Sequence, residues 1–201
     1  MRGVVLAGGE ARRYGGRPKG LLEVGGRRIL DIVAAALSEA TGALPLLVAN
    51  ASDAVAWRPD LRTIPDLRPG FGSLGGIYTA VASGSGPVLC VAWDMPFVTA
   101  DLLRALITGA EGCDVFLPES DGRRGVEPLC AVYGPACRVA IEAQLATGDL
   151  KAIGFHDRVK VGTLPLERVR AVGGRDPAEL FFNVNRPEDL ERAEGVWRRR
   201  G

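Results

Sequence analysis

A glycine-rich segment near the start of the chain has residues suited to holding phosphate groups. Gly8 and Gly9 come directly after the apolar run 4–7, and Arg13 and Lys19 follow. Glycines let backbone N–H groups approach phosphate oxygens closely, and the two cations supply the charge that a triphosphate needs. The segment is neither a Walker loop nor a dinucleotide fingerprint, because their glycine and lysine spacings are absent. It predicts a phosphate-binding loop, and an exposed loop with solvated arginines is the alternative.

Two aspartates could contribute carboxylates beside such phosphates. Asp94 follows the apolar run 88–92, and Asp66 follows the shorter run 63–64. A carboxylate at the end of a buried strand, next to phosphate groups, is a typical Mg²⁺ ligand. Asp94 is therefore a candidate metal ligand, although each aspartate could instead only begin a turn.

A pair of asparagines stands near the end of the chain. Asn183 and Asn185 precede Pro187, and the only other asparagine, Asn50, ends a predicted strand. In an extended segment the two side chains of the pair would project to the same side. The alternative is that Asn185 or Arg186 only caps the helix that begins at Pro187. Since capping seldom requires Asn rather than Asp or Ser, the pair indicates a polar binding site.

These residues must be positioned by alternating strands and helices. Apolar runs of strand length predict strands at residues 4–7, 46–49, 63–64, 87–92, 114–118, 127–133 and 159–164. Helical spacing predicts helices at 30–42, 74–83, 101–108, 135–145 and 188–199, the second and third of them capped by Ser73 and Thr99. Gly25 and Gly26 predict a tight hairpin within 21–29.

This alternation predicts one α/β domain over residues 1–201, a mostly parallel sheet with helices on both faces. Ligands of such sheets bind beyond the carboxyl ends of the strands. Gly8, Gly9, Asn50, Asp66 and Asp94 stand at those ends. They are therefore expected to share one cleft.

Composition narrows the function classes. A net charge of +1 does not favour nucleic acid or a membrane surface as a partner. We find neither a signal peptide nor an apolar run long enough to span a membrane. Four cysteines without CxxC spacing and a single histidine give no metal-binding set. Reduced thiols in a cytoplasmic protein are the expectation.

The motifs, taken in order, resemble the MobA family of molybdenum cofactor guanylyltransferases, within the nucleotidyltransferases that carry an NTP on a Rossmann-like sheet. The matching segments are 6–22, Asp66 with 72–77, 93–97, 127–131 and 182–190. The chain departs from the family pattern at Tyr14, Ser73, Gly75, Trp93 and Arg186, where Met, Pro, Ala, Cys and Thr are usual. None of these departures removes an expected phosphate, metal or amide ligand.

The resemblance implies a nucleotide-diphospho-sugar-transferase-like fold, with GTP bound by the N-terminal half and the acceptor by the C-terminal half. It implies transfer of GMP from GTP to the terminal phosphate of molybdenum-loaded molybdopterin, with proteins that deliver the cofactor to molybdoenzymes as further partners. The implied nucleotide-binding residues are Leu6, Ala7, Gly8, Gly9, Lys19, Asn50, Asp66 and Asp94. Asp94, Lys19 and Arg13 would be catalytic, with Mg²⁺ on Asp94, and Asn183 and Asn185 would bind the acceptor.

Two other functions remain open from the sequence. One is a cytidylyl or other nucleotidyl transferase acting on a different phosphorylated acceptor. Cytidylyl-transferring relatives tend to have Ala where this chain has Gly8, and the missing methyl leaves room for a purine. The other is a non-catalytic adaptor that binds GTP or the cofactor, against which Asp94 argues, because binding alone needs no carboxylate at the α-phosphate.

Overall fold

The computed structural model describes residues 1–8 and 18–199. Gly9 and Arg13, two of the predicted phosphate-binding residues, lie outside the described residues. Among the described residues, no helix combines the length and the apolar character needed to cross a bilayer. The four cysteines are all free thiols.

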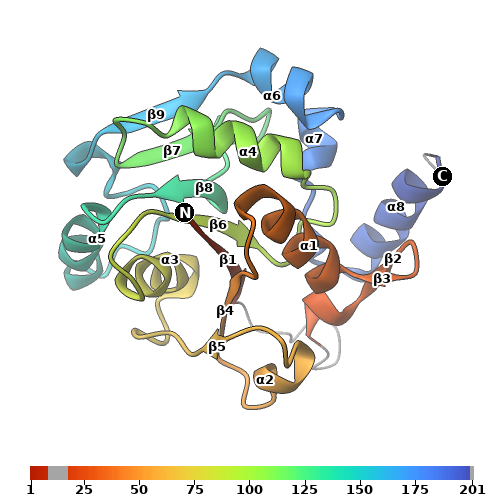
Figure 1. Cartoon of the computed structure of the whole chain (residues 1–201), viewed down its shortest axis with the longest axis horizontal. Coiled ribbons are helices and arrows are strands. Elements are labelled where there is room, and N and C mark those ends of the chain that lie inside the picture. Colours follow the sequence, from red (N-terminus) through yellow and green to blue (C-terminus); the bar gives the residue numbers. More distant parts are fainter. Residues whose placement is uncertain (9–17, 200–201) are drawn as a thin grey trace.

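A mixed sheet of seven strands forms the centre of the domain, in the order β5-β4-β1-β6-β8-β7-β9 (Figure 1). The strands are β1 (Arg2–Ala7), β4 (Leu46–Ala49), β5 (Thr63–Ile64), β6 (Val88–Ala92), β7 (Val115–Pro118), β8 (Cys130–Tyr133) and β9 (Val161–Leu164). In the central strand, Val4 pairs with Leu46 on one side and with Cys90 on the other. The predicted, mostly parallel sheet is confirmed.

Strand β8 is the antiparallel member of this sheet. The chain leaves β7 and turns back through a short loop, in which the Ser120 N–H donates to the Gly125 carbonyl at 2.9 Å. Parallel strands need a crossover connection of a dozen or more residues, usually a helix, so a short loop of this kind joins antiparallel strands. The reversal places residues 127–129, predicted to be strand but forming a turn, at the edge where β1 and β6 end. There the Ala92 N–H donates to the Leu129 carbonyl at 2.8 Å.

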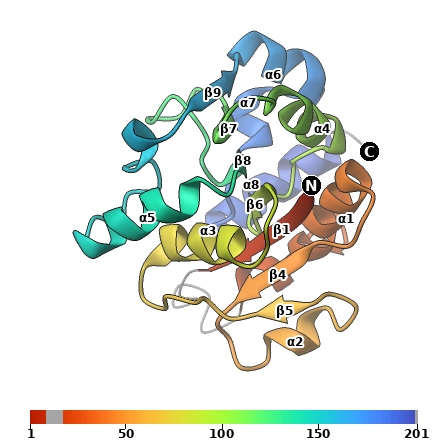
Figure 2. The ribbon, with the colours of Figure 1, turned by 60° about the vertical axis from the view of Figure 1, so that its left-hand side comes forward.

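Helices cover both faces of the sheet, as predicted. On one face lie α1 (Ile29–Thr41) and α4 (Ala100–Gly109), and on the other α3 (Gly72–Ala82) and α5 (Cys137–Ala146) (Figures 1 and 2). Alternate residues of β1 enter the two cores: Val5 and Ala7 belong to the first, Val4 and Leu6 to the second. The site must therefore lie at a strand end, since both faces are covered.

The predicted helix starts were right in one case and wrong in another. The Thr99 side chain accepts a hydrogen bond from the Leu102 N–H and caps α4. Ser73 does not cap α3, which begins at Gly72 after Phe71. The Phe71 carbonyl already accepts from the Gly75 N–H at 3.2 Å, so Ser73 lies within the first turn.

The smaller elements surround this framework. They are a 3₁₀ turn η2 (Lys19–Leu21), the hairpin β2 (Glu23–Val24) and β3 (Arg27–Arg28), α2 (Ala54–Trp57), η3 (His156–Arg158), α6 (Leu166–Gly173), α7 (Pro177–Leu180) and α8 (Pro187–Arg198). The hairpin and α8 were predicted, whereas α2, α6 and α7 were not. Helix α8 packs beside the hairpin (Figure 1).

Candidate active site

A cavity of about 170 Å³ opens at the carboxyl ends of β1, β4 and β6. The predicted residues that line it are Leu6, Gly8, Asn50, Asp66 and Asp94. Ala7 is buried in the core on the other face of β1 and is not among the lining residues. A larger hollow of about 680 Å³ at the amino ends of the strands contains none of the predicted residues. The expected cleft is therefore confirmed for the residues that the structure describes.

Asn50 and Asp66 form one polar unit at the β4–β5 side of the cavity. Asn50 Nδ2 donates to Asp66 Oδ2 at 2.6 Å, and the Asp66 N–H donates to Asn50 Oδ1 at 2.8 Å. Burial raises the pKa of the Asp66 carboxyl, against the hydrogen bonds from Asn50 and Thr79 that lower it. The unit offers acceptor oxygens of fixed orientation, which suits the hydroxyl and N–H groups of a nucleoside.

Asp94 presents a buried carboxylate at the β6 end of the cavity. Its Oδ1 is buried and has no hydrogen-bond partner among the described residues. Burial raises the pKa of this carboxyl, while the nearby positive charge of Lys19 acts in the opposite direction. A buried carboxylate oxygen without a partner is costly, and a hard cation that prefers oxygen ligands would satisfy it. Asp94 therefore fits as one ligand of a divalent metal ion, although the described residues contain no group of three or more His, Cys, Asp or Glu side chains placed to hold one.

The C-terminal asparagine motif is hydrogen-bonded to both Lys19 and Asp94. Lys19 Nζ donates to Asn185 Oδ1 at 2.6 Å, and the Val184 N–H donates to the Asp94 carbonyl at 2.9 Å. Asn185 is not the cap of α8. The cap residue is Arg186, and the Asp189 carboxylate accepts from its N–H at 2.9 Å. The capping alternative is thus wrong for Asn185.

Asn183 occupies a different place from Asn185. It lines a second cavity of about 370 Å³ together with Glu127, Phe181 and Phe182. Its Nδ2 donates to the Phe181 carbonyl at 2.8 Å, which leaves the amide oxygen for a ligand. The two asparagines therefore serve neighbouring regions rather than one shared pocket.

Glu127 is a candidate that the residue patterns alone did not single out. It lies in the turn before β8 and lines the second cavity, and its Oε1 accepts from the Leu129 N–H at 3.0 Å. Burial raises the pKa of its carboxyl most, and the negative charge of Asp94 raises it further. The one sequence observation that could have indicated Glu127 is its place in segment 127–131, which resembles the family. Its position near Asp94 depends on the reversed direction of β8.

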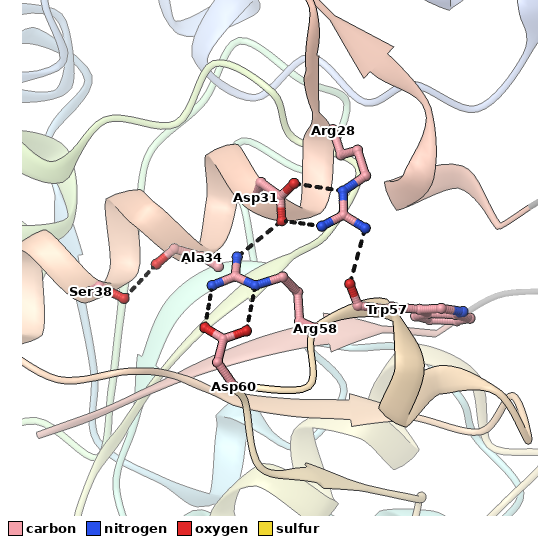
Figure 3. Close-up of polar contacts among 7 residues, drawn as sticks. All are labelled: Arg28, Asp31, Ala34, Ser38, Trp57, Arg58 and Asp60. Carbon is pink, nitrogen blue, oxygen red and sulfur yellow. Dashed lines mark hydrogen bonds and ion pairs between the residues drawn. The ribbon is translucent and has the colours of Figure 1, made fainter.

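A network of ion pairs supports the nucleotide side of the site (Figure 3). Asp31 on α1 accepts from Arg28 at 2.6 Å and from Arg58 at 3.0 Å, and Arg58 also pairs with Asp60. Arg28 in turn donates to the Trp57 carbonyl at 3.0 Å. Partly exposed ion pairs contribute about 1 kcal/mol or less each. Their effect here is to fix α2 and its tryptophan.

Trp57 connects this ion-pair network, through Trp93, to the turn that carries Lys19. Its ring stacks on Trp93, with ring centroids 5.2 Å apart and planes 20° from parallel. The Trp93 ring lies against Gly20, where a Cβ would be only 2.3 Å from Cε3. Trp93 therefore packs directly against the turn that carries Lys19.

Comparison with known proteins agrees with this geometry. Residues 3–159 match the family described as the MobA-like NTP transferase domain. The probable molybdenum cofactor guanylyltransferase of Pelotomaculum thermopropionicum is 38% identical over 192 residues, covering 95% of this chain and 90% of that protein. The molybdenum cofactor guanylyltransferase of Desulfosudis oleivorans is 35% identical, covering 98% of this chain and 95% of that protein.

A solved structure is similar over the full length. It is the molybdopterin-guanine dinucleotide biosynthesis protein A from Archaeoglobus fulgidus, with a TM-score of 0.83 and 30% identity, covering 99% of this chain and all of that chain (100%). The similarity therefore includes the C-terminal asparagine motif, which lies beyond the matched family domain.

Proposed function

Because this chain belongs to the family of MobA-like NTP transferases, we propose that it is a molybdenum cofactor guanylyltransferase, which transfers GMP from GTP to the terminal phosphate of molybdopterin. The observation that carries the proposal is the 170 Å³ cavity, in which the Asn50–Asp66 unit lies opposite Asp94. Nucleoside recognition and phosphate chemistry are then provided at the two ends of one site.

The nucleoside of GTP occupies the β4–β5 end of this cavity. Asn50 and Asp66 accept from its hydroxyl or N–H groups there. Gly8 forms part of the wall, and a Cβ built at this position meets no described atom within 4 Å. The space left open by the missing methyl supports a purine, although a cytidylyl or other nucleotidyl transferase with a different acceptor is the alternative.

The triphosphate extends from there toward Lys19 and Asp94, with Gly9 and Arg13 completing the phosphate-binding loop. Asp94 would hold Mg²⁺, with phosphate oxygens and water as its other ligands, as is usual for Mg²⁺ in nucleotide sites. When bound, the metal would neutralise charge that develops on the phosphate oxygens. Lys19 provides the same kind of stabilisation from the protein, and Asn185 fixes the direction of its ammonium group.

The reaction needs no general base from this chain. An oxygen of the acceptor phosphate forms a bond to the α-phosphorus, the bond from that phosphorus to the bridging oxygen breaks, and pyrophosphate leaves. A phosphomonoester is already mostly dianionic near neutral pH, since its second pKa is about 6. The protein therefore contributes alignment and charge stabilisation. Asn183, beside the second cavity, would contact the acceptor.

Asp94→Asn tests the metal assignment and the transfer together. The variant keeps the size of the side chain but loses its charge, so GTP should still bind while transfer falls by about 10²–10³-fold. Pyrophosphate release would be measured with molybdopterin and each of the four NTPs in turn, with Mg²⁺ present or chelated. Asp101→Asn, an exposed carboxylate paired with Arg104 on α4, is the control.

The outcomes separate the alternatives. Pyrophosphate release that occurs with GTP but not with the other three NTPs supports the proposal, provided that it is lost on chelation of Mg²⁺ and in Asp94→Asn. A preference for CTP would identify a cytidylyltransferase, and GTP binding without any release would identify an adaptor. Near-normal release from Asp94→Asn would remove the metal role from this residue.

A further inference from the structure

We propose that Glu127 recognises the pterin of the acceptor, accepting hydrogen bonds from its ring N–H and its neighbouring 2-amino group. The inference rests on the proposed function, because it concerns the acceptor half of the same site. It adds a specificity-determining residue that neither asparagine supplies.

The strand order places Glu127 on the acceptor side of the reacting centre. The Asn50–Asp66 unit follows β4 and β5, Asp94 follows β6, and Glu127 precedes β8, which is the next strand beyond β6. Along this edge, Asp94 therefore lies between the nucleoside end and Glu127. Since the transfer joins two substrates across the α-phosphate, the second substrate must extend toward β8.

The carboxylate of Glu127 is oriented and half free. Its Oε1 accepts from the Leu129 N–H at 3.0 Å, which fixes the side chain within its own turn. No hydrogen bond or ion pair reaches Oε2 from the rest of the described chain. Glu127 itself lines the cavity, so its carboxylate is within reach of a ligand bound there. A ligand with N–H donors can reach it.

The cavity beside Glu127 fits a flat heterocycle better than a second phosphate. It measures about 370 Å³, and Phe181, Phe182 and Asn183 line it together with Glu127. Aromatic rings give a planar ligand apolar surface to pack against. The Glu127 carboxylate would repel an anion, so the phosphate of the acceptor stays at Lys19 and Asp94.

A carboxylate is the natural partner for this edge of a pterin. The ring N–H and the adjacent amino group of a 2-amino-4-oxopteridine point in parallel, as the N–H groups of a guanidinium do, and a carboxylate accepts from such a pair with two parallel bonds. A site built for such donors discriminates strongly against an analogue that lacks one of them. Guanine has the same edge, so the test must measure both substrates.

Glu127→Gln is the decisive variant. The glutamine keeps an oxygen that accepts from the Leu129 N–H. It presents an NH2 group, in place of an accepting oxygen, to the pterin donors. The apparent KM for molybdopterin should rise roughly 10- to 100-fold, as expected for a lost hydrogen bond to a charged group, while the KM for GTP stays within twofold. Asp101→Asn on α4 is the control, since its carboxylate is exposed, is paired with Arg104 at 2.6 Å and does not line this cavity. It should leave both constants unchanged.

A competition experiment on the unaltered protein gives a second, independent readout. The 2-amino-4-oxopteridine should inhibit transfer at least tenfold better than 2,4-dioxopteridine, which lacks the amino group, and Glu127→Gln should lose this preference. An unchanged acceptor KM in Glu127→Gln, an equal effect of Asp101→Asn, a larger effect on GTP, or no preference between the two pteridines would each overturn the assignment. If the unaltered protein transfers no GMP at all, the proposed function itself fails.

Discussion

Gly20 is the point at which the Lys19 turn meets the tryptophan stack, and Gly20→Ala should disturb both. The new Cβ would lie 2.3 Å from Cε3 and 2.8 Å from Cδ2 of Trp93, so either the ring or the turn must move. The ring has little freedom, because its other face is stacked on Trp57. Overpacking of this kind costs about 1–3 kcal/mol. At about 2–4 °C per kcal/mol for a domain of this size, Tm should fall by about 2–12 °C.

Displacement of the turn should also lower the rate of GMP transfer. Lys19 precedes Gly20, and a misplacement of about 1 Å in a catalytic group can cost about 100-fold in rate. We therefore expect kcat/KM for GTP to fall by about 10- to 100-fold in Gly20→Ala. Thermal unfolding and pyrophosphate release measured on the same preparation test the two effects together.

A double variant shows whether the ring is the cause. Cysteine is usual at position 93 in the resembled family. Adding Trp93→Cys removes the clashing ring and should restore most of the activity lost in Gly20→Ala. Gly86→Ala is the control, because a Cβ there meets nothing within 4 Å. The reasoning is refuted if Gly20→Ala keeps its Tm and kcat/KM, or if the double variant is no better than the single one.

Two further predictions concern polar groups. Asn185→Ala releases the Lys19 ammonium from its 2.6 Å hydrogen bond, so kcat/KM for GTP should fall roughly tenfold, and an unchanged GTP titration would contradict this role. Burial lowers the pKa of His156 below its ordinary value of 6.5, so its neutral form stabilises the fold and that contribution is lost as the pH falls below this value. Tm should therefore decline more steeply between about pH 7.5 and pH 5.5 in the unaltered protein than in His156→Gln, and equal slopes would rule out this histidine as the cause.

Elements that bury a continuous apolar run were predictable from the sequence. The runs that form β1 and β6 are buried on both sides, and the hairpin was predicted from Gly25 and Gly26, both of which adopt positive φ. Helix α6 gave no such signal, because its buried residues are only Val169 and Gly173 among several charged ones. Its apolar stripe is too narrow to be distinguished from a loop by periodicity.

The candidate site was predictable where a strand end alone positions a residue. Asn50, Asp66 and Asp94 follow strands, so the general rule for parallel sheets was enough to bring them together. The contact of Lys19 with Asn185 spans 166 positions and depends on how α8 and the hairpin pack. Neither periodicity nor residue type carries that information, so this contact was not predicted: Lys19 was expected at the phosphates and Asn185 at the acceptor. Glu127 was missed as a site residue for the same kind of reason, because its place depends on the direction of β8.

The hydrogen bonds that join the asparagine motif to Lys19 and Asp94 also determine when a newly synthesised chain acquires its site. The strands of the described sheet all end by Leu164, so the sheet can assemble while the last part of the chain is still being made. The Lys19 ammonium gains Asn185 as its acceptor, and the Asp94 carbonyl gains the Val184 N–H as its donor, only after the C-terminal segment has been made. A chain that ends before Val184 would lack the hydrogen-bond partner of Lys19 and also the buried core residues Val184, Ala193 and Val196. Assembly of the sheet and onset of activity are thus separate events in the life of this protein.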